Sequence, residues 1–549
     1  LSQYNDITHG GFIAVLAVLA GLLIHSAIKA SEQDAKPRTQ KSWTSTIRNF
    51  IKQHPVVTIV LTIYVVLMVQ ESSWFYKEIV TWYDDIYSDH LLNNFSLRKS
   101  FINETMGRND FRFYPLSHQD LHALSWVTPY VKIWSLVSAL ELIATIILGC
   151  KLVEVIRKNK PSASLILMGT LLFLFTSSSA YNYFQFIYSE RFLTFLLALY
   201  AYHYSVYLNS GQLKNGRLAV LFALFIPFFK DVAVLLSVIP AITTIAAGAL
   251  GAVPGRPKWG AIRPLSWMHS YALEIAIISL APFFLASFAI LSALPSLAAG
   301  VQRYDAHLGF SVLALDIRLI FFLVFIAFRI WLVGRKGADI TALDGLNLAA
   351  LAYGFALYAL VGIEGSNYMS LPIQFVAVLD ILMIWENYAA PSLKHMNSRQ
   401  TQAVALGTML LLLTIEDRQA ATFRQRANLI SWKQRSWRTT LNAASAITKR
   451  ARENGETVNI IYSKGWFQHS DQMKALTYDR LVYYDIDKKH YRIKAGEDKG
   501  KFYEPQPGDY LIDIDTGKKL TKYGVDLSNY TLVYQEDPDR QYARIFRHR

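Results

Sequence analysis

The sequence predicts a polytopic α-helical membrane protein that ends in a small soluble α/β domain. Two observations lead to this fold class. The chain is 52% hydrophobic and only 17% charged, with a mean hydropathy of +0.22, which is more apolar than a soluble protein of 549 residues. Its apolar residues also occur in blocks of about 12 to 23 residues, most of them near the length that crosses a bilayer.

About twelve apolar blocks are candidate membrane spans. Lys230-Asp231 directly follows the short block that ends at Phe229, so this block and the next are expected to form a broken or re-entrant pair. The first block is interpreted as a membrane helix rather than a signal peptide, because no basic residue precedes it. The predicted spans are Gly11–Ile28, Val56–Trp74, Val131–Val153, Ala163–Ser179, Phe192–Leu208, Leu218–Phe229, Val232–Leu250, Tyr271–Ala293, Phe310–Leu332, Leu346–Val361, Leu371–Trp385 and Ala403–Ile415.

Basic residues in the short loops predict the orientation of these spans. Lys and Arg gather in loops that all fall on one side of the twelve-span arrangement, and such loops are typically cytoplasmic. This clustering, together with contacts to anionic headgroups, accounts for the net charge of +14 without nucleic acid. No basic patch interleaved with base-stacking aromatics is present, which argues against nucleic-acid binding. The opposite, extracytoplasmic side receives residues 71–130, 181–191, 302–308, 362–369 and the chain from Glu416.

The single cysteine, Cys150, excludes a disulfide within the chain and makes a cysteine-based metal site implausible.

The C-terminal part of the chain has a different character. Arg418–Glu453 is predicted to be an amphipathic helix, and Asn454-Gly455 ends it. Turn signals such as Pro507-Gly508-Asp509 separate the short β-rich runs that follow. The predicted domains are thus a transmembrane domain, residues 1–415, and a soluble α/β domain, residues 416–549. The predicted strands are Thr457–Tyr462, Arg480–Tyr484, Tyr510–Ile514, Tyr530–Tyr534 and Tyr542–Phe546.

An acidic stretch in the segment Glu71–Tyr130 is the first candidate site. The segment has about sixty residues, too many for a bare connection between helices. If its first part is helical, Asp85 and Asp89 share one face, with Asp84 beside them. This face could hold a divalent cation such as Mg²⁺ or Mn²⁺ through oxygen ligands, or supply a general base to a hydroxyl group. A solvated helix face is the alternative interpretation.

The order Tyr83-Asp84-Asp85 and then Gly107-Arg108, in a loop after a membrane helix, resembles the polyprenol-phosphate-dependent glycosyltransferases of the C-type (GT-C) fold. The glucosyltransferases that modify O-antigens are the most similar. The resemblance covers the architecture of the whole chain, but specific residues only in this loop. It implies that Asp84 or Asp85 prepares the acceptor hydroxyl, as a base or a metal ligand. The family's acidic pair usually follows the first membrane helix, so Gly11–Ile28 is either an extra span or not a span.

Basic residues predicted on the same face are candidates for binding a lipid phosphate, since the leaving phosphate gains negative charge as the glycosidic bond breaks. Each has an acidic neighbour in the sequence, so a structural ion pair is the competing interpretation. Charges near membrane depth favour a functional role, and Lys230-Asp231 is the strongest case. Asp316-Ile317-Arg318 is a further pair near a helix start. The candidate substrate-binding residues are Arg108, Asp110, Arg112, Glu190, Arg191, Lys230 and Arg303.

Two histidines and the C-terminal domain are weaker candidates. His118 and His122, at i and i+4 of a helix with Asp120 between them, could bind a metal, although a polar interfacial helix is the favoured interpretation. In the C-terminal domain, Gly465-Trp466, His469, Asp471 and Pro507-Gly508-Asp509-Tyr510-Leu511 resemble the periplasmic domains that end many C-type glycosyltransferases. No catalytic constellation is evident there, so capping the cavity or helping to bind the acceptor glycan is its expected role.

The resemblance implies an inverting transfer of a sugar from a polyprenyl phosphate to a glycan or glycolipid acceptor outside the cytoplasm. The implied location is a bacterial inner (cytoplasmic) membrane, with the lipid bilayer as a further partner. Two alternatives stay open. One is a transporter or flippase, for which two related halves and broken midmembrane helices would be expected. The other is an oligosaccharide polymerase or ligase that uses the same lipid carriers.

Overall fold

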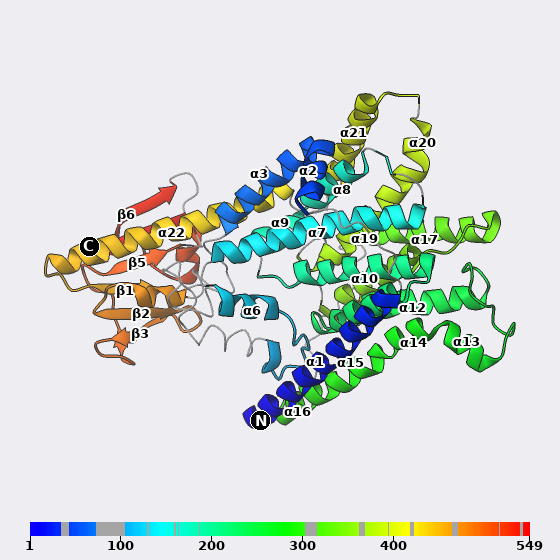
Figure 1. The fold of residues 1–549 in the computed structure, drawn as a ribbon. Helices are drawn as coiled ribbons and strands as arrows, with labels where there is room; N and C mark the ends of the chain where they lie inside the picture. The colour runs from blue at the N-terminus through cyan, green and yellow to red at the C-terminus, as the bar shows by residue number, and fades with distance from the viewer. Residues whose placement is uncertain are drawn as a thin grey trace. The chain divides into compact units, whose positions relative to one another are not determined.

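The structure is a computed structural model, and its described residues form two compact units. A helical unit contains α1 to α21, apart from the ends of α3, α6 and α7. The main part of the sheet unit begins at Ala427, within α22, and ends at Arg549. Figure 1 shows the helices of the first unit and the strands of the second. The structure describes residues 1–33, 43–72, 105–128, 131–158, 161–162, 164–185, 187–301, 316–361, 368–393, 395–417, 422–463, 470–514, 517–537 and 542–549.

The described helices of the helical unit account for most of its residues. The first half contains α1 (Ser2–Gln33), α2 (Trp43–Gln53), α3 (Pro55–Ser72), α6 (Gln119–Val127), α7 (Val131–Arg157), α8 (Leu165–Leu174), α9 (Ser177–Phe184), α10 (Glu190–Ser210), α11 (Leu213–Phe225), η1 (Ile226–Phe228) and α12 (Val234–Ala249). The second half contains α13 (Pro264–Ser270), α14 (Ala272–Ile278), α15 (Leu280–Phe288), η2 (Ala289–Ala293), α16 (Leu294–Ala298), α17 (Ile317–Lys336), α18 (Ala342–Ala356), η4 (Leu357–Val361), η5 (Tyr368–Ser370), α19 (Leu371–Ile384), η6 (Trp385–Ala389), α20 (Ala390–Ser392) and α21 (Ser398–Asp417).

Six helical stretches in the described part of the chain are long and apolar enough to cross a membrane. Two pairs of helices also pass this test together but are bent, α2 with α3 by 109° and α8 with α9 by 73°, so the number of spans is at most eight. The chain therefore has the character of a multi-pass membrane protein, but the twelve predicted spans are not supported. The six stretches are Ser2–Glu32, Lys132–Arg157, Ala272–Ala298, Ile317–Lys336, Ala342–Ala359 and Tyr368–Ser392.

The excess in the predicted count comes from four helices. The helix α11 has 13 residues and α12 has 16, so at 1.5 Å per residue they are about 20 and 24 Å long, short of a hydrocarbon core of about 30 Å. The helices α10 and α21 have 21 and 20 residues, but polar side chains interrupt them. An apolar block in a sequence does not reveal where its helix will end. The predicted break after Phe229 is confirmed, because η1 and a turn separate α11 from α12.

Local sequence explains where several helices start and stop. Thr341 and Asp344 form a capping box that starts α18. Gly211 and Gly337 end α10 and α17 in left-handed conformations, with φ of 68° and 65°, which glycine adopts without a side-chain clash. Asp316 starts α17 by accepting a hydrogen bond from the backbone N–H of Arg318 at 3.0 Å.

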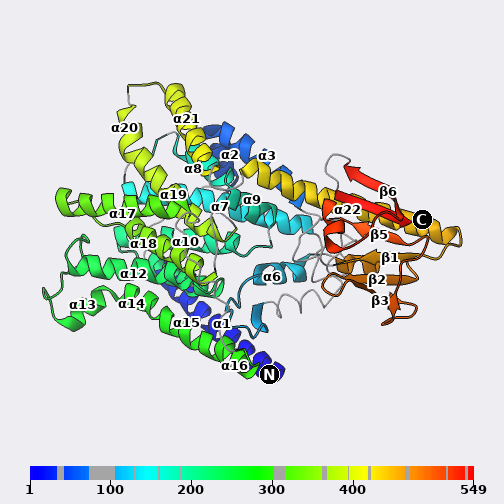
Figure 2. The same ribbon diagram turned by 180° about the vertical axis from the view of Figure 1, so that it is seen from behind.

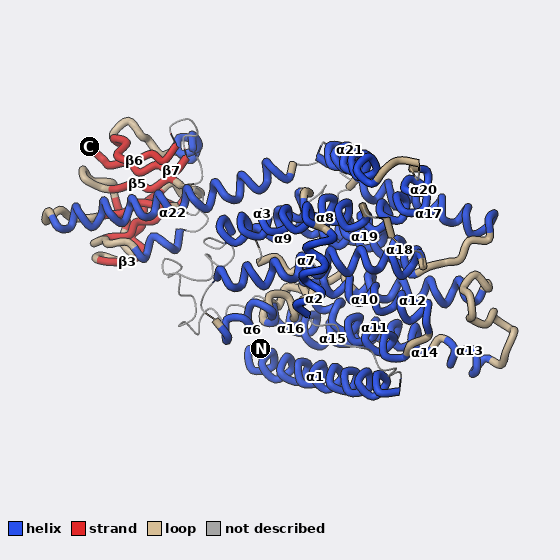
Figure 3. The backbone as a smooth tube through the Cα atoms, turned by 45° about the horizontal axis from the view of Figure 1, so that its top comes forward, coloured by secondary structure: helices blue, strands red, loops and turns tan. Residues whose placement is uncertain are grey.

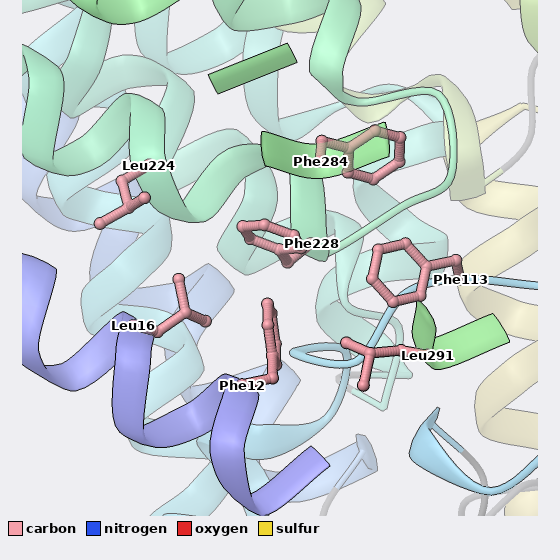
Figure 4. Packing of buried hydrophobic residues seen from close by; sticks show 7 residues of the cluster. All are labelled: Phe12, Leu16, Phe113, Leu224, Phe228, Phe284 and Leu291. Atoms are coloured by element: carbon pink, nitrogen blue, oxygen red, sulfur yellow. The ribbon is translucent and has the colours of Figure 1, made fainter. Parts of the chain in front are cut away.

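The N-terminal helix α1 is part of the helical unit. Phe12 and Leu16 are buried in a cluster with Phe113, Phe228 and Phe284, as well as Leu224 and Leu291 (Figure 4). The ring of Phe12 meets that of Phe228 edge-on, at a centroid distance of 4.9 Å. The N-terminal helix therefore packs on the same core that holds the Phe113 segment.

The sheet unit contains a seven-stranded mixed sheet with the order β4-β3-β2-β1-β5-β7-β6. The strand β1 is parallel to both of its neighbours, β2 and β5, and the remaining pairs are antiparallel. Figure 3 shows the strands in red beside α22. The strands are β1 (Asn459–Tyr462), β2 (Arg480–Asp485), β3 (His490–Gly496), β4 (Phe502–Tyr503), β5 (Tyr510–Asp513), β6 (Tyr530–Asp537) and β7 (Tyr542–His548).

The helix α22 (Phe423–Glu453) buries one stripe along its length. Trp437, Leu441, Ala444, Thr448 and Ala451 are buried at spacings of three and four residues, so they share one face of the helix. The amphipathic helix predicted over Arg418–Glu453 is therefore confirmed from Phe423 onward.

All five predicted strands are present. The strands β3 and β4 were not predicted. Only Ile493 of β3 is buried, and β4 has two residues. Strands this polar or this short carry no hydrophobic alternation for a sequence pattern to reveal.

Candidate functional site

Charged and aromatic side chains meet at one end of the helical unit. The start of α10, the turn between η1 and α12, the start of α6 and the short helix η5 supply them. Glu190 and Arg191 come from α10, Lys230 and Asp231 from the turn, and Tyr368 from η5. Glu190, Arg191 and Lys230 are buried, so their charges need partners within the protein.

Arg191 is the most deeply buried cation of this group, with 1% of its surface exposed. Its guanidinium donates one hydrogen bond to Glu141 in α7 and another to Asp120 in α6. The planar fork of a guanidinium can serve two carboxylates at once. Arg191 therefore ties α6, α7 and α10 together at this end of the unit.

Lys230 pairs with Glu190 across 40 residues of sequence. Its Nζ donates a hydrogen bond to Glu190 Oε1 at 2.9 Å. Both side chains are almost wholly buried, and the Lys230 ammonium also lies 5.7 Å from the centre of the Tyr368 ring. A cation at this distance from an aromatic face is attracted to it.

Arg191 and Lys230 do form ion pairs, but not with the acidic residue next to each in the sequence, Glu190 and Asp231. Glu190 pairs with Lys230, and Asp231 pairs with Arg112. Consecutive residues of a helix point about 100° apart and do not face each other, so adjacent charges find partners on other elements.

The described end of the segment 71–130 is attached to the helical unit through Asp231. Arg112 Nε donates to Asp231 Oδ2 at 2.6 Å, and the backbone N–H of Phe113 donates to Asp231 Oδ1 at 3.0 Å. Arg108 forms the predicted local pair with Asp110 at 2.9 Å, and both side chains are about one third exposed. The segment is thus held at a residue adjacent to Lys230.

Three half-buried tyrosines lie beside the Lys230–Glu190 pair. The rings of Tyr188 and Tyr368 stack with their centres 4.1 Å apart and an angle of 17° between their planes. The ring of Tyr181 meets each of them nearly edge-on, at 6.4 and 6.3 Å. We call these residues the tyrosine cluster. Arg426 covers the ring of Tyr181 at 4.1 Å.

A second buried polar cluster surrounds the start of α17. Arg318 Nε donates to Asp316 Oδ1 at 2.9 Å, and its guanidinium also donates to Gln374 in α19. Gln374 Nε2 in turn donates to the backbone oxygen of Leu172 in α8 at 3.1 Å. The predicted Asp316–Arg318 pair therefore exists, and it joins three helices.

Every described basic candidate has a carboxylate partner, and this limits what these cations can do. Arg108, Arg112, Arg191 and Lys230 each form at least one ion pair. A phosphate would have to share or displace the carboxylate. Their role as phosphate ligands stays a prediction.

Several candidate residues from the sequence lie outside the described part of the chain. They are Asp84, Asp85, Asp89 and Arg303. Among the residues that the structure does describe, no group of three or more His, Cys, Asp or Glu side chains is arranged to hold a metal ion. The predicted Mg²⁺ or Mn²⁺ site depends on the three aspartates and stays a prediction.

The predicted helical pair of His118 and His122 is wrong. The helix α6 begins at Gln119, and His118 precedes it with a φ of 64°, so the two imidazoles do not share a helix face. His122 Nδ1 instead forms a hydrogen bond with Gln119 Oε1 at 2.9 Å. Asp120 between them pairs with Arg191.

The tyrosine cluster and Glu141 escaped the sequence analysis. Two loops that were both predicted to be extracytoplasmic contain Tyr181, Tyr188 and Tyr368. The aromatic residues of these loops were the one feature of the sequence that could have indicated the cluster. Glu141 is a lone acid in an otherwise apolar span, and a lone acid at such a place requires a buried cation.

No model of a known protein family matches this sequence, and no curated protein matches it either.

Arg191→Gln is expected to destabilise the protein by about 3–5 kcal/mol, because two buried carboxylates lose their cation. Arg191→Lys should lie between this variant and the wild type, since an ammonium does not reproduce the guanidinium fork. The midpoint of thermal unfolding of the purified protein measures the effect. Arg108→Gln, which removes an exposed pair, is the control and should cost less than about 1 kcal/mol. Equal midpoints for Arg191→Gln and Arg108→Gln would contradict the assigned role.

Acid is expected to destabilise the protein through His118. Burial of its imidazole, assisted by Arg191, lowers the pKa of His118 to about 4, although Asp120 and Glu190 act in the opposite direction. The folded state therefore favours the neutral ring. Its stabilising contribution is complete above the ordinary pKa of 6.5 and is lost as the pH falls toward 4.

His118→Asn removes this titration and suits the left-handed backbone at that position. Unfolding midpoints of the wild type and of this variant, compared between pH 7 and pH 4, measure the difference. The wild type should lose more stability than the variant over this interval. Parallel curves for the two proteins would rule out His118 as the sensitive group.

Proposed function

We propose that the protein is an integral membrane glycosyltransferase that moves a sugar from a polyprenyl-phosphate donor to a glycan or lipid-linked acceptor. The observation that carries this proposal is the tyrosine cluster next to Lys230. Aromatic faces suit the apolar faces of sugar rings, and an ammonium suits a phosphate. Here the Lys230 ammonium lies 5.7 Å from the ring of Tyr368.

The attachment of the acidic segment to the same place supports the proposal. Arg112 and Phe113, near the end of that segment, bind Asp231, the neighbour of Lys230. Asp84 and Asp85 precede Arg112 in this segment. A carboxylate from it is the proposed base that removes the proton of the acceptor hydroxyl, as that oxygen attacks the anomeric carbon and the lipid phosphate leaves.

The ion pairs give the described cations a defined role in this mechanism. Glu190 holds the Lys230 ammonium in place within a buried setting. Arg191, Asp120 and Glu141 hold the helix ends that carry the pair. As the leaving phosphate gains charge, a fixed ammonium stabilises it more than the mobile water it replaces.

The proposed location is a bacterial inner membrane, with the tyrosine cluster and the C-terminal domain on the extracytoplasmic side. The sorting of the loops supports this orientation. The ends of α7 and α10, the loop after α12 and the connection between α17 and α18 line one cavity at the other end of α10 from Glu190, and its lining includes Arg157, Lys158 and Arg256. Basic loops are typically cytoplasmic.

A transporter is the second candidate, and one buried acid favours it. Asp380 lies wholly buried in α19, where its Oδ1 accepts a hydrogen bond from Asn347 Nδ2 at 2.8 Å. Ionisable residues inside membrane helices often mark substrate or proton pathways. Uptake of substrate into vesicles without any glycosylated product would support this candidate over the transferase. A polymerase or ligase would use the same lipid carriers, and the length of the glycan product identifies it.

Asp84→Asn and Asp85→Asn, made separately, test the proposed base. Transfer of labelled sugar from a polyprenyl-phosphate donor in proteoliposomes should fall about 10²- to 10⁴-fold in the variant that lacks the base, because an amide accepts no proton. Asp487→Asn, in an exposed turn between β2 and β3, is the control and should retain full transfer. Full transfer in both test variants would refute the assignment of the base to this pair.

Tyr368→Ala and Tyr368→Phe test the aromatic platform. The alanine variant loses the ring that stacks on Tyr188, so the KM for the sugar donor should rise on the order of tenfold. The phenylalanine variant keeps the ring and should stay close to the wild type. Steady-state kinetics with a varied donor concentration separate the two. Unaltered KM in Tyr368→Ala would argue against donor binding at the cluster.

A further inference from the structure

The short helix α2 is joined to α3 by a sharp bend. Only His54 separates the two helices, and their axes differ in direction by 109°. Pro55, the first residue of α3, explains the bend, because its ring disfavours a helical conformation in the residue before it and it has no N–H to donate. Figures 1 and 2 show α2 beside the start of α3, both in blue. The two helices are therefore nearly perpendicular.

The helix α3 has the length and the surface of a membrane span. Its 18 residues make it about 27 Å long, close to a hydrocarbon core of about 30 Å. Val56, Ile59 and Ile63 follow the bend on one side of α3, and each is more than half exposed. A continuous exposed apolar face on such a helix indicates contact with lipid. The surface of the bilayer therefore lies near the bend, and α2 does not have to enter the hydrocarbon core to complete the span.

The side chains of α2 separate into an apolar face and a basic edge. Ile47, Phe50 and Ile51 are three and four residues apart, so they share one face of the helix. Ile47 and Ile51 are 54% and 46% exposed although they are apolar. Arg48 and Lys52, one turn apart beside this face, are also exposed and form no ion pair with a described carboxylate. No other described helix packs along α2.

The charge around α2 favours an anionic lipid surface as the partner of this face. Residues 36–54 contain five Lys or Arg and no Asp or Glu. An amphipathic helix with basic residues beside its apolar face lies in the plane of the membrane surface, and its cations attract anionic headgroups. The nearly perpendicular junction with α3 places α2 in that plane. A second copy of α2 would instead bring like charges together.

We infer that α2 is a membrane-surface helix that binds anionic phospholipids. Ile47, Phe50 and Ile51 insert at the boundary between the headgroups and the acyl chains, and Arg48 and Lys52 pair with lipid phosphates. The bound headgroups fix the depth at which α3 enters the bilayer. This inference rests on the membrane character of the chain and is independent of the proposed glycosyl transfer.

The first test measures the depth of α2 in the full-length protein, in nanodiscs of equal parts phosphatidylcholine and phosphatidylglycerol. Cys150 is the only cysteine and is buried, so Cys150→Ala gives a background in which one added cysteine carries a spin label. With Ile47→Cys and Ile51→Cys, oxygen dissolved in the lipid should reach the label. With Asn49→Cys and Gln53→Cys, on the opposite face, a water-soluble nickel complex should reach it instead.

Power saturation of the electron spin resonance signal reports which of the two reagents reaches each label. Unfolding midpoints identify any variant that is merely misfolded. Four labels in water, or four labels in lipid, would overturn the inference. Labels at Ile47 and Ile51 that neither reagent reaches would show that protein, such as a second copy, covers this face, and would overturn it as well.

The second test measures which lipid lies beside α2. A bimane fluorophore at Ile51→Cys is quenched by brominated phosphatidylglycerol or by brominated phosphatidylcholine, and the ratio gives their relative affinity. Arg48→Gln and Lys52→Gln should each lower the preference for phosphatidylglycerol about fivefold, as expected for one basic residue at the surface. Lys501→Gln, which removes an exposed lysine of the sheet unit, is the control and should leave the preference unchanged. Equal quenching by the two lipids when Arg48 and Lys52 are present, or an unchanged preference in both variants, would refute lipid binding by α2.

Discussion

The contact between Arg191 and its two carboxylates is the interaction on which one end of the helical unit depends. Arg191 is 1% exposed, and its partners Glu141 and Asp120 belong to two other helices. A charge this deep is stable only when its partners are present and correctly oriented. The triad therefore sets the position of the first turn of α10, and with it Glu190, which holds Lys230.

This dependence explains how apolar helices can present a dense set of charges to one place. Arg112, Arg191 and Lys230 are each matched by a carboxylate from another element, so these pairs also act as connections between elements. The tyrosine cluster lies beside the Lys230–Glu190 ion pair, and its aromatic rings are half-buried. Polar groups that are held so firmly are pre-organised, which favours binding because little order has to be created when a ligand arrives.

The sequence predicted the long apolar helices and the C-terminal strands better than the number of spans and the partners of the charged residues. Long apolar blocks identified helices such as α1, α7 and α17, and turn residues separated all five predicted strands. The number of spans was overestimated because helix ends depend on caps and breaks that hydropathy does not report. The candidate site was predicted only in part. Glu190, Arg191 and Lys230 were recognised as charges near membrane depth, but Glu141 and the tyrosine cluster were not.

The sequence by itself determined the apolar composition, the break after Phe229 and the residue types available at each loop. Only the tertiary structure decided which of them meet. Lys230 finds Glu190 rather than Asp231, and Arg112 reaches Asp231 across 119 positions of the chain. The physical reason is geometric. Adjacent residues of a helix or turn point in different directions, so a buried charge is satisfied by whichever element packs against it, and packing is a property of the whole chain.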